Sequence, residues 1–195
     1  MPRITAGEWK GIELASPRQI RATEAKVRQA LFNILGETVD DARVIDGFAG
    51  SGAIGFEALS RGAAFVAFIE SDTDAVLCIR ENLAKFEAQL PREAWRLLHL
   101  DVERGLRQLA MNEPPFDLIV LDPPYRTDEG KKALNAVVDC AILAPTGIVV
   151  VEHDQRTILP ASIGPLHQCK RHRYGDTVLS LYQAGSAENV SQEGH

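Results

Sequence analysis

Apolar and polar positions follow two patterns along this chain, and the alternation of the two predicts its fold. From residue 42 onward, short and nearly continuous apolar runs are followed by longer segments in which apolar residues recur every three or four positions. The short runs indicate strands covered on both faces, and the longer segments indicate amphipathic helices. Their alternation is typical of an α/β fold with a parallel sheet wrapped by helices.

Seven segments have the strand pattern and three long segments have the helix pattern. The predicted strands are residues 42–46, 65–70, 95–100, 117–122, 147–152, 166–173 and 177–183. The predicted helices are residues 52–61, 72–89 and 129–143. Tyr174-Gly175-Asp176 separates the last two strands, and a glycine turn of this kind joins antiparallel strands into a hairpin. We therefore expect a seven-stranded, mostly parallel sheet with a C-terminal antiparallel hairpin.

Two segments precede this core and one follows it. Residues 1–20 suggest an extended arm or a small hairpin, and residues 21–35 form an amphipathic helix with Val27 and Leu31 on its apolar side. Residues 185–195 are polar and are expected to be flexible. The predicted organisation is an arm and helix over residues 1–35, a main domain over residues 36–184, and a tail over residues 185–195.

The composition indicates a single globular domain with no membrane span and no metal site. The chain has 195 residues, 45% of them hydrophobic, which suits one globular domain. No apolar run approaches the roughly 18 residues that a membrane span needs, and the first residues lack a signal-peptide pattern, so we expect a cytoplasmic protein with no membrane partner. Its three cysteines form no Cys-x-x-Cys pair and its five histidines are scattered, so no metal site is predicted.

The net charge of −6 argues at first against a nucleic-acid partner. Its distribution weakens that argument, because residues 1–32 carry six Lys or Arg against three Glu. A second basic cluster, Lys170-Arg171-His172-Arg173, lies near the end of the chain. Charge alone leaves two interpretations open: these clusters contact nucleic acid, or they are ordinary solvated surface.

The segment Asp46-Gly47-Phe48-Ala49-Gly50-Ser51-Gly52 predicts a cofactor site. It follows the first strand of the core, and glycines in such a turn let a nucleotide-like group approach the backbone. Glu70 ends the next predicted strand, 24 positions after Asp46. A carboxylate at this place can accept hydrogen bonds from both ribose hydroxyls. The carboxylate of Asp46 would repel a pyrophosphate but suits an ammonium or sulfonium group, which favours S-adenosylmethionine over a nicotinamide cofactor.

Asp101 is a further candidate for this cofactor site. It closes the third strand, where it can bind the adenine amino group, but it can equally cap a helix that starts at Val102. The residues expected at the cofactor from these patterns are Asp46, Phe48, Ala49, Gly50, Ser51, Gly52, Glu70 and Asp101.

Asp122-Pro123-Pro124-Tyr125, after the fourth strand, predicts the chemistry. Although two prolines can simply make a rigid turn, that interpretation does not explain the flanking carboxylate and aromatic ring. Methylation of an aromatic amine needs acceptors for its N–H bonds, and the Asp122 carboxylate and the Pro123 carbonyl can supply them from a rigid backbone. Tyr125 can stack on a base that has left its helix. Guanine is mildly favoured over adenine, because its adjacent N1–H and N2–H₂ donors match a carboxylate.

With these motifs the chain resembles the RsmD-type family of bacterial 16S rRNA (guanine-N2)-methyltransferases, from Arg3 to about Tyr182. The motifs that carry the resemblance are Arg3-Ile4-Thr5-Ala6-Gly7, Arg21-Ala22-Thr23, Leu31-Phe32-Asn33-Ile34-Leu35, Asp46 to Gly52, Glu57 to Gly62, Asp122 to Tyr125, and Tyr174-Gly175-Asp176-Thr177. Ala22 departs from the family, which usually has proline there.

The resemblance implies a class I S-adenosylmethionine-dependent methyltransferase with a Rossmann-like fold, and a role for Thr23 at the cofactor. It also implies that a monomer acts on 16S rRNA in an assembling small ribosomal subunit, where part of the contact can be with ribosomal proteins. The expected RNA contacts are Arg3, Lys10, Arg18, Arg21, Lys170, Arg171 and Arg173. Two alternatives remain: a DNA adenine-N6 methyltransferase, and a catalytically idle RNA-binding module that uses the same fold.

Overall fold

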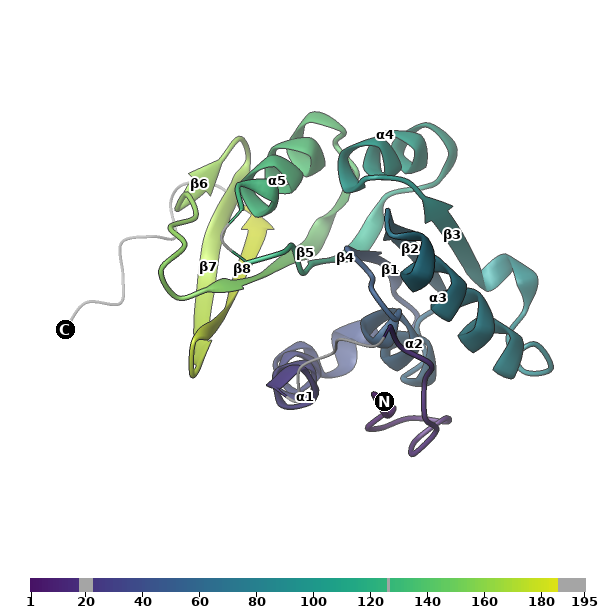
Figure 1. Ribbon diagram of the computed structural model, residues 1–195. Coiled ribbons are helices and arrows are strands. Elements are labelled where there is room, and N and C mark those ends of the chain that lie inside the picture. The colour runs from purple at the N-terminus through teal and green to yellow at the C-terminus, as the bar shows by residue number, and fades with distance from the viewer. Residues whose placement is uncertain (18–22, 126, 186–195) are drawn as a thin grey trace.

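One eight-stranded sheet organises the computed structural model, which describes residues 1–17, 23–125 and 127–185 (Figure 1). The strands lie in the order β3-β2-β1-β4-β5-β8-β7-β6. Strands β1 to β5 are parallel, whereas β8, β7 and β6 are each antiparallel to the neighbour before them in this order. The strands are β1 (Arg43–Gly47), β2 (Phe65–Glu70), β3 (Trp95–His99), β4 (Phe116–Leu121), β5 (Leu143–Asp154), β6 (Ser162–Ile163), β7 (Leu166–Tyr174) and β8 (Thr177–Ala184).

Helices cover both faces of this sheet, which explains why its central strands are almost continuously apolar (Figure 1). Helices α1, α2 and α3 pack on one face together with the N-terminal arm, and α4 and α5 pack on the other. The helices are α1 (Thr23–Leu35), α2 (Ala53–Ser60), α3 (Thr73–Lys85), α4 (Val102–Asn112) and α5 (Glu129–Asp139), with two short 3-10 turns, Gly36–Val39 and Arg92–Ala94.

The sheet order places the candidate motifs together. Strand β1 lies between β2 and β4, so the strand order changes direction there. In open α/β sheets a crevice forms beyond the carboxyl ends of the strands at such a point. Asp46 and Gly47 end β1, Glu70 ends β2, and Asp122 directly follows β4, so all four residues lie at this end of the sheet.

The predicted fold class is confirmed, and three details of the prediction are wrong. The sheet has eight strands instead of seven, because the two-residue strand β6 pairs with the start of β7. Helix α3 ends at Lys85 instead of Gln89, since Phe86 leaves the helix and stacks on Trp9 of the arm with ring centroids 4.1 Å apart. Helix α5 ends at Asp139, and Leu143 already belongs to β5, where it pairs with Phe116.

The N-terminal arm is packed into the main core. Its first residues return on themselves through an isolated antiparallel bridge between Arg3 and Glu13, which agrees with the small hairpin suggested by the sequence. Ile4, Trp9 and Leu14 are buried in the same apolar cluster as α1, α2 and α3. The arm is therefore held by burial along its length.

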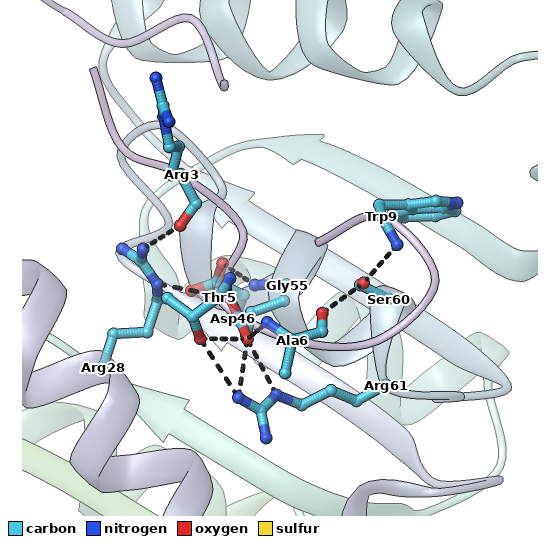
Figure 2. A network of polar contacts seen from close by, with 10 residues as sticks. Arg3, Thr5, Ala6, Trp9, Arg28, Asp46, Gly55, Ser60 and Arg61 are labelled. Atoms are coloured by element: carbon cyan, nitrogen blue, oxygen red, sulfur yellow. Dashed lines mark hydrogen bonds and ion pairs between the residues drawn. The ribbon is translucent and has the colours of Figure 1, made fainter. Parts of the chain in front are cut away.

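A buried carboxylate fixes the arm to α2. Glu57, fully buried in α2, accepts hydrogen bonds from the backbone amides of Thr5 and Ala6 at 2.8 and 3.0 Å and from Arg61 Nε at 2.9 Å. Arg28 of α1 lies 3.8 Å away as a second cation. Figure 2 shows Thr5, Ala6, Arg28 and Arg61 converging from three elements on this point. Pairing of this kind offsets the cost of burying a charge.

Among the residues that the structure describes, none of the helices is both long enough and apolar enough to span a bilayer. Residues 186–195 of the predicted tail lie outside the described part of the chain.

Candidate active site

A cavity of about 930 Å³ lies at the carboxyl ends of the parallel strands and contains both candidate motifs. This volume is at the upper end of the range of small-molecule sites, so it has room for a nucleoside cofactor and a second aromatic ring. Its described lining residues include Val27, Phe48, Glu70, Leu100, Asp101, Val102, Asp122, Pro123, Pro124, Tyr125, Lys132, Glu152, Tyr174 and Thr177.

The glycine-rich turn has the backbone conformation that its residues predict. Gly50 and Gly52 have φ values of +56° and +76°, in the left-handed region that favours glycine. At Gly52 a side chain would also collide with Phe56, whose ring lies 2.9 Å from an ideal Cβ position. Phe48 is not a glycine yet has φ +63°, and it is the residue of the turn that reaches the cavity wall. A left-handed phenylalanine is unusual and is held here by the surrounding turn.

Glu70, at the end of β2, is held by three hydrogen bonds from backbone amides. One carboxylate oxygen accepts from the amides of Ser71 and Asp72 at 2.7 and 2.8 Å, and the other accepts from the Gly50 amide at 2.7 Å. The last contact joins the end of β2 to the glycine-rich turn. Glu70 lines the cavity, as the sequence predicts for a residue that binds ribose hydroxyls. That binding role stays a prediction.

Asp46 lies beneath the turn. It is 1% exposed, does not line the cavity, and its carboxylate accepts from the Gly55 amide at 2.8 Å (Figure 2). Burial, followed by the nearby charge of Glu70, raises the pKa of Asp46 to about 7, although the Gly55 amide and Arg28 act in the opposite direction. In this position Asp46 caps the start of α2. Direct contact with a cofactor stays a prediction for Asp46, Ala49, Gly50, Ser51 and Gly52, none of which is among the lining residues.

Asp101 caps a helix and also lines the cavity, whereas its contact with an adenine amino group stays a prediction. Its carboxylate caps α4 by accepting from the Arg104 amide at 2.9 Å, and the residue also lines the cavity. Leu100 and Val102 line the cavity beside it, so an apolar wall stands next to a carboxylate. This combination suits a flat aromatic ring with an amino group at its edge.

The Asp122-Pro123-Pro124-Tyr125 segment forms the opposite end of the cavity. The Asp122 amide donates to the Gly47 carbonyl at 3.2 Å, which ties the segment to the end of β1. The Tyr125 hydroxyl lies 3.0 Å from the Glu152 carboxylate of β5 and 2.8 Å from the Thr177 hydroxyl of β8. Burial raises the pKa of Tyr125, and the charges of Glu152 and Asp122 act in the same direction. The phenol therefore stays protonated at neutral pH.

Sequence reasoning missed Glu152 and Thr177 as residues of this site. One signal was available for Glu152, because it lies near the carboxyl end of a parallel strand, like Glu70 and Asp101. Thr177 was recognised only as part of a hairpin motif. Tyr174, recognised like Thr177 only as part of the hairpin motif, also lines the cavity. Lys132 of α5 lines it too, and no pattern in the sequence pointed to Lys132.

The described wall of the cavity has a clear excess of negative charge. Among the described lining residues, one is basic, Lys132, and eight are carboxylates. The carboxylates are Glu70, Asp72, Asp101, Glu103, Asp122, Glu129, Glu152 and Asp176. Such a wall favours a cationic small molecule and disfavours a phosphate group. These carboxylates, and not the buried Asp46, are the groups that would disfavour a pyrophosphate here.

The predicted RNA-binding cations are divided between the arm and β7. Lys10 is exposed, whereas the exposed guanidinium of Arg3 is paired with Glu13. Lys170, Arg171 and Arg173 are exposed on β7, near the edge of the sheet. Arg18 and Arg21 lie outside the described residues, and for Thr23 the structure gives only its place at the start of α1. RNA contact by these residues stays a prediction.

Comparisons with known proteins agree with this geometry. A family model described as conserved hypothetical protein 95 matches residues 2–183. The chain is 32% identical to ribosomal RNA small subunit methyltransferase D of Escherichia coli strain K12, over 93% of this chain and 89% of that protein. It is 34% identical to a Bacillus subtilis protein named "Putative rRNA methyltransferase YlbH", over 93% of this chain and 98% of the relative.

A solved structure from Escherichia coli, described as "Putative methyltransferase yhhF", has the same fold. It superposes with a TM-score of 0.80 at 31% identity and covers 95% of this chain and 98% of that chain.

Proposed function

The chain belongs to the RsmD-type family, whose model is described as conserved hypothetical protein 95, and from this membership we propose that it is an S-adenosylmethionine-dependent rRNA methyltransferase. We propose further that the methyl group is transferred to the exocyclic N2 of a guanine in 16S rRNA. One observation carries the proposal: Asp122-Pro123-Pro124-Tyr125 lies in the same cavity as Glu70 and Asp101. This shared cavity supports the proposal, because the residues proposed to direct the amine and those proposed to hold the nucleoside of the cofactor line one space.

The residues present fit the methyl donor. Phe48, Leu100 and Val102 provide an apolar wall for its adenine ring, and Asp101 stands beside them for the adenine amino group. Glu70 would hold the ribose, and the carboxylate-rich wall favours its cationic amino acid end. When bound, S-adenosylmethionine supplies an electrophilic methyl group on a sulfonium ion.

The reaction requires little of the protein beyond positioning. The exocyclic amine of guanine is a weak nucleophile because its lone pair is delocalised into the ring. Asp122 and the Pro123 carbonyl accept hydrogen bonds from its two N–H groups, which turns the lone pair toward the methyl group. The two prolines keep both acceptors in place before the base arrives. Tyr125 supports the base by stacking. As the new N–C bond forms, the bond between the sulfonium sulfur and the methyl carbon would break, with S-adenosylhomocysteine as the leaving group. The amine would give up one proton, which Asp122 would accept directly or through water.

The choice of guanine follows from the charge of the acceptor. A carboxylate can accept N1–H and N2–H₂ together, whereas adenine presents an acceptor at N1 beside its amino donor. A DNA adenine-N6 methyltransferase is therefore the second candidate.

The distribution of charge indicates how RNA approaches the protein. The acidic cavity repels phosphates, so only an extruded base enters it, while the backbone remains outside against exposed cations. Lys170, Arg171 and Arg173 on β7 are suitable cations, since β7 leads directly to the turn that lines the cavity. Because the whole chain has a net charge of −6, we propose that the substrate is an assembling small subunit whose basic ribosomal proteins share the contact. The protein acts there as a monomer in the cytoplasm.

The proposal is tested by identifying the product. Purified protein and labelled S-adenosylmethionine are supplied with unmodified small subunits, naked 16S rRNA or duplex DNA, and the nucleosides are analysed by mass spectrometry. We expect N2-methylguanosine, with more product on the subunit than on naked rRNA. N6-methyladenosine or its deoxy form would replace the proposal with the adenine alternative. No product on any substrate would support the idle RNA-binding module.

A further inference from the structure

The hydroxyl group of Tyr125 joins three separate segments of the chain. Tyr125 follows β4, Glu152 lies 27 positions further along on β5, and Thr177, 52 positions from Tyr125, begins β8. Strands β5 and β8 are antiparallel neighbours in which Glu152 pairs with Leu179, so Thr177 is its diagonal neighbour on the same face. The sheet register therefore aims both side chains at one point, where the phenol oxygen lies.

The donors and acceptors of this cluster can be assigned. An ionised Glu152 can only accept, so the Tyr125 hydroxyl donates its hydrogen bond to Glu152 over the 3.0 Å contact. The Thr177 hydroxyl then donates to the phenol oxygen over the 2.8 Å contact. Glu152 and Thr177 are 9% and 4% exposed, so little water competes for these two hydrogen bonds.

We propose that Glu152 and Thr177 are positioning residues for methyl transfer, which fix the ring of Tyr125 for the target base and couple the β7–β8 hairpin to the catalytic segment. The inference rests on the proposed function, because it assigns how the base-stacking residue of that reaction is held. A tyrosine attached only through its own backbone can rotate about two side-chain bonds. Two hydrogen bonds at the far end of the ring remove that freedom before the base arrives.

The coupling follows from where Thr177 lies. It directly follows the turn Tyr174-Gly175-Asp176, which lines the cavity, and that turn is itself fixed to the loop after β5. Gln155 donates to the Asp176 carbonyl at 2.8 Å and to its carboxylate at 2.7 Å. Strand β7, which carries the exposed cations Lys170, Arg171 and Arg173, continues into the same turn. RNA that docks on β7 therefore contacts an element which holds Tyr125 at its other end.

A double-mutant cycle tests this assignment. Tyr125→Phe keeps the ring and removes its hydroxyl, while Thr177→Val removes the second hydroxyl at nearly constant volume. We expect each to lower kcat/KM on small subunits by about tenfold, as for the loss of well-made hydrogen bonds. The loss of kcat/KM in the double variant should be no larger than in Tyr125→Phe alone, because Tyr125→Phe already removes both hydrogen bonds. Affinity for S-adenosylhomocysteine, measured by calorimetry, should change by less than about twofold.

Three further variants separate positioning from general stability. Thr177→Ser keeps the hydroxyl and should retain wild-type kcat/KM. Glu152→Gln keeps an acceptor oxygen and should lose less than Tyr125→Phe. Ser180→Ala is the matched control, because it removes a buried hydroxyl from the same strand, one that contacts His153 at 2.8 Å. Any loss of kcat/KM from Ser180→Ala should multiply with the loss from Tyr125→Phe in the double variant.

Several outcomes would overturn the inference. Losses from Tyr125→Phe and Thr177→Val that multiply in the double variant would show that Thr177 does not act through Tyr125. Unchanged kcat/KM in both single variants would show that the hydroxyl contacts do not matter for transfer. A loss in Glu152→Gln larger than in Tyr125→Phe would show that the charge of Glu152 acts directly on the substrate. If the wild type itself forms no methylated nucleoside, the proposed function fails, and the inference fails with it.

Discussion

The two ends of the cavity are held in different ways. At the cofactor end, Glu70 is fixed by the amides of the two residues that follow it and by Gly50, only 20 positions away. At the base end, Tyr125 is fixed by side chains 27 and 52 positions away on two other strands. The contacts of Glu70 thus need only the neighbouring strands β1 and β2, whereas the Tyr125 cluster forms only once β5 and β8 have paired. The two ends should respond differently to mutation.

The largest effect is expected from Asp122→Ala at the base end. Loss of the main amine acceptor should lower kcat by about 100- to 1000-fold. Affinity for S-adenosylhomocysteine should remain nearly unchanged, because Asp122 lies across the cavity from Glu70. Single-turnover kinetics and calorimetry on the same preparation provide both values. Asp122→Asn keeps one acceptor oxygen and should fall between the wild type and Asp122→Ala. A large loss of cofactor affinity in Asp122→Ala would contradict the division of the cavity.

The buried carboxyl of Asp46, beneath the glycine-rich turn, is expected to make the free energy of unfolding depend on pH. The pKa of this carboxyl rises from 3.8 to about 7 on folding, so between these pH values the folded protein holds a proton that the unfolded chain lacks. Its contribution to the free energy of unfolding is full below about pH 4 and is lost as the pH rises through about 7. We expect a change of roughly 2–4 kcal/mol over this range.

This pH dependence is measured by urea unfolding of the wild type and Asp46→Asn between pH 4 and pH 8. The asparagine keeps an acceptor for the Gly55 amide, so the difference between the two proteins isolates the carboxyl group. The wild type should lose stability relative to the variant as the pH rises. A constant difference would mean that Asp46 titrates normally.

Glu70→Ala is expected to have a moderate effect that is confined to the cofactor. Removal of an acceptor for the ribose should weaken S-adenosylhomocysteine binding by about 10- to 100-fold, as for hydrogen bonds to a charged group. At saturating methyl donor, kcat should change by no more than a few-fold. Glu103→Gln, another carboxylate on the cavity wall, is the matched control for general negative charge. Equal losses of affinity in both variants would contradict a specific ribose contact.

The smallest effect is expected from the cations on β7. Replacement of Lys170, Arg171 and Arg173 by alanine should raise KM for the small subunit by several-fold, with kcat and cofactor affinity unchanged. The salt dependence of binding should become shallower by about one unit of slope for each lost phosphate contact. Arg107→Ala on α4, whose side chain is 61% exposed, controls for general surface charge. An unchanged salt slope in the triple variant would remove β7 from the RNA interface.

Much of this architecture could be predicted from the sequence, because it depends on local patterns. Apolar runs and amphipathic spacing predict seven of the eight strands. Phe48, Glu70, Asp101 and Asp122, each singled out from its motif, line one cavity. In each case a strand end and the turn after it determine the position. Asp46 shows the limit of such patterns: its place at a strand end was clear, but only the structure shows that it lies beneath the turn.

The features that the sequence could not give depend on contacts between distant segments. Helix α3 ends four residues early because Phe86 stacks on Trp9 of the arm, and nothing near Phe86 signals this. The Tyr125 cluster depends on the register between β5 and β8, which no single segment encodes. Glu57 was part of a recognised motif, yet its role as the anchor of the arm appears only when the amides of Thr5 and Ala6 reach it.

A crystal structure of the protein with S-adenosylhomocysteine tests the central claim most directly, because it places one ligand across both ends of the cavity. The account predicts that the ribose hydroxyls contact the Glu70 carboxylate and the adenine lies near Asp101. The sulfur atom should then face Asp122 and Pro123. A complex with the ribose away from Glu70, or with the sulfur directed away from Asp122, would contradict the division of this cavity into a cofactor end and a base end.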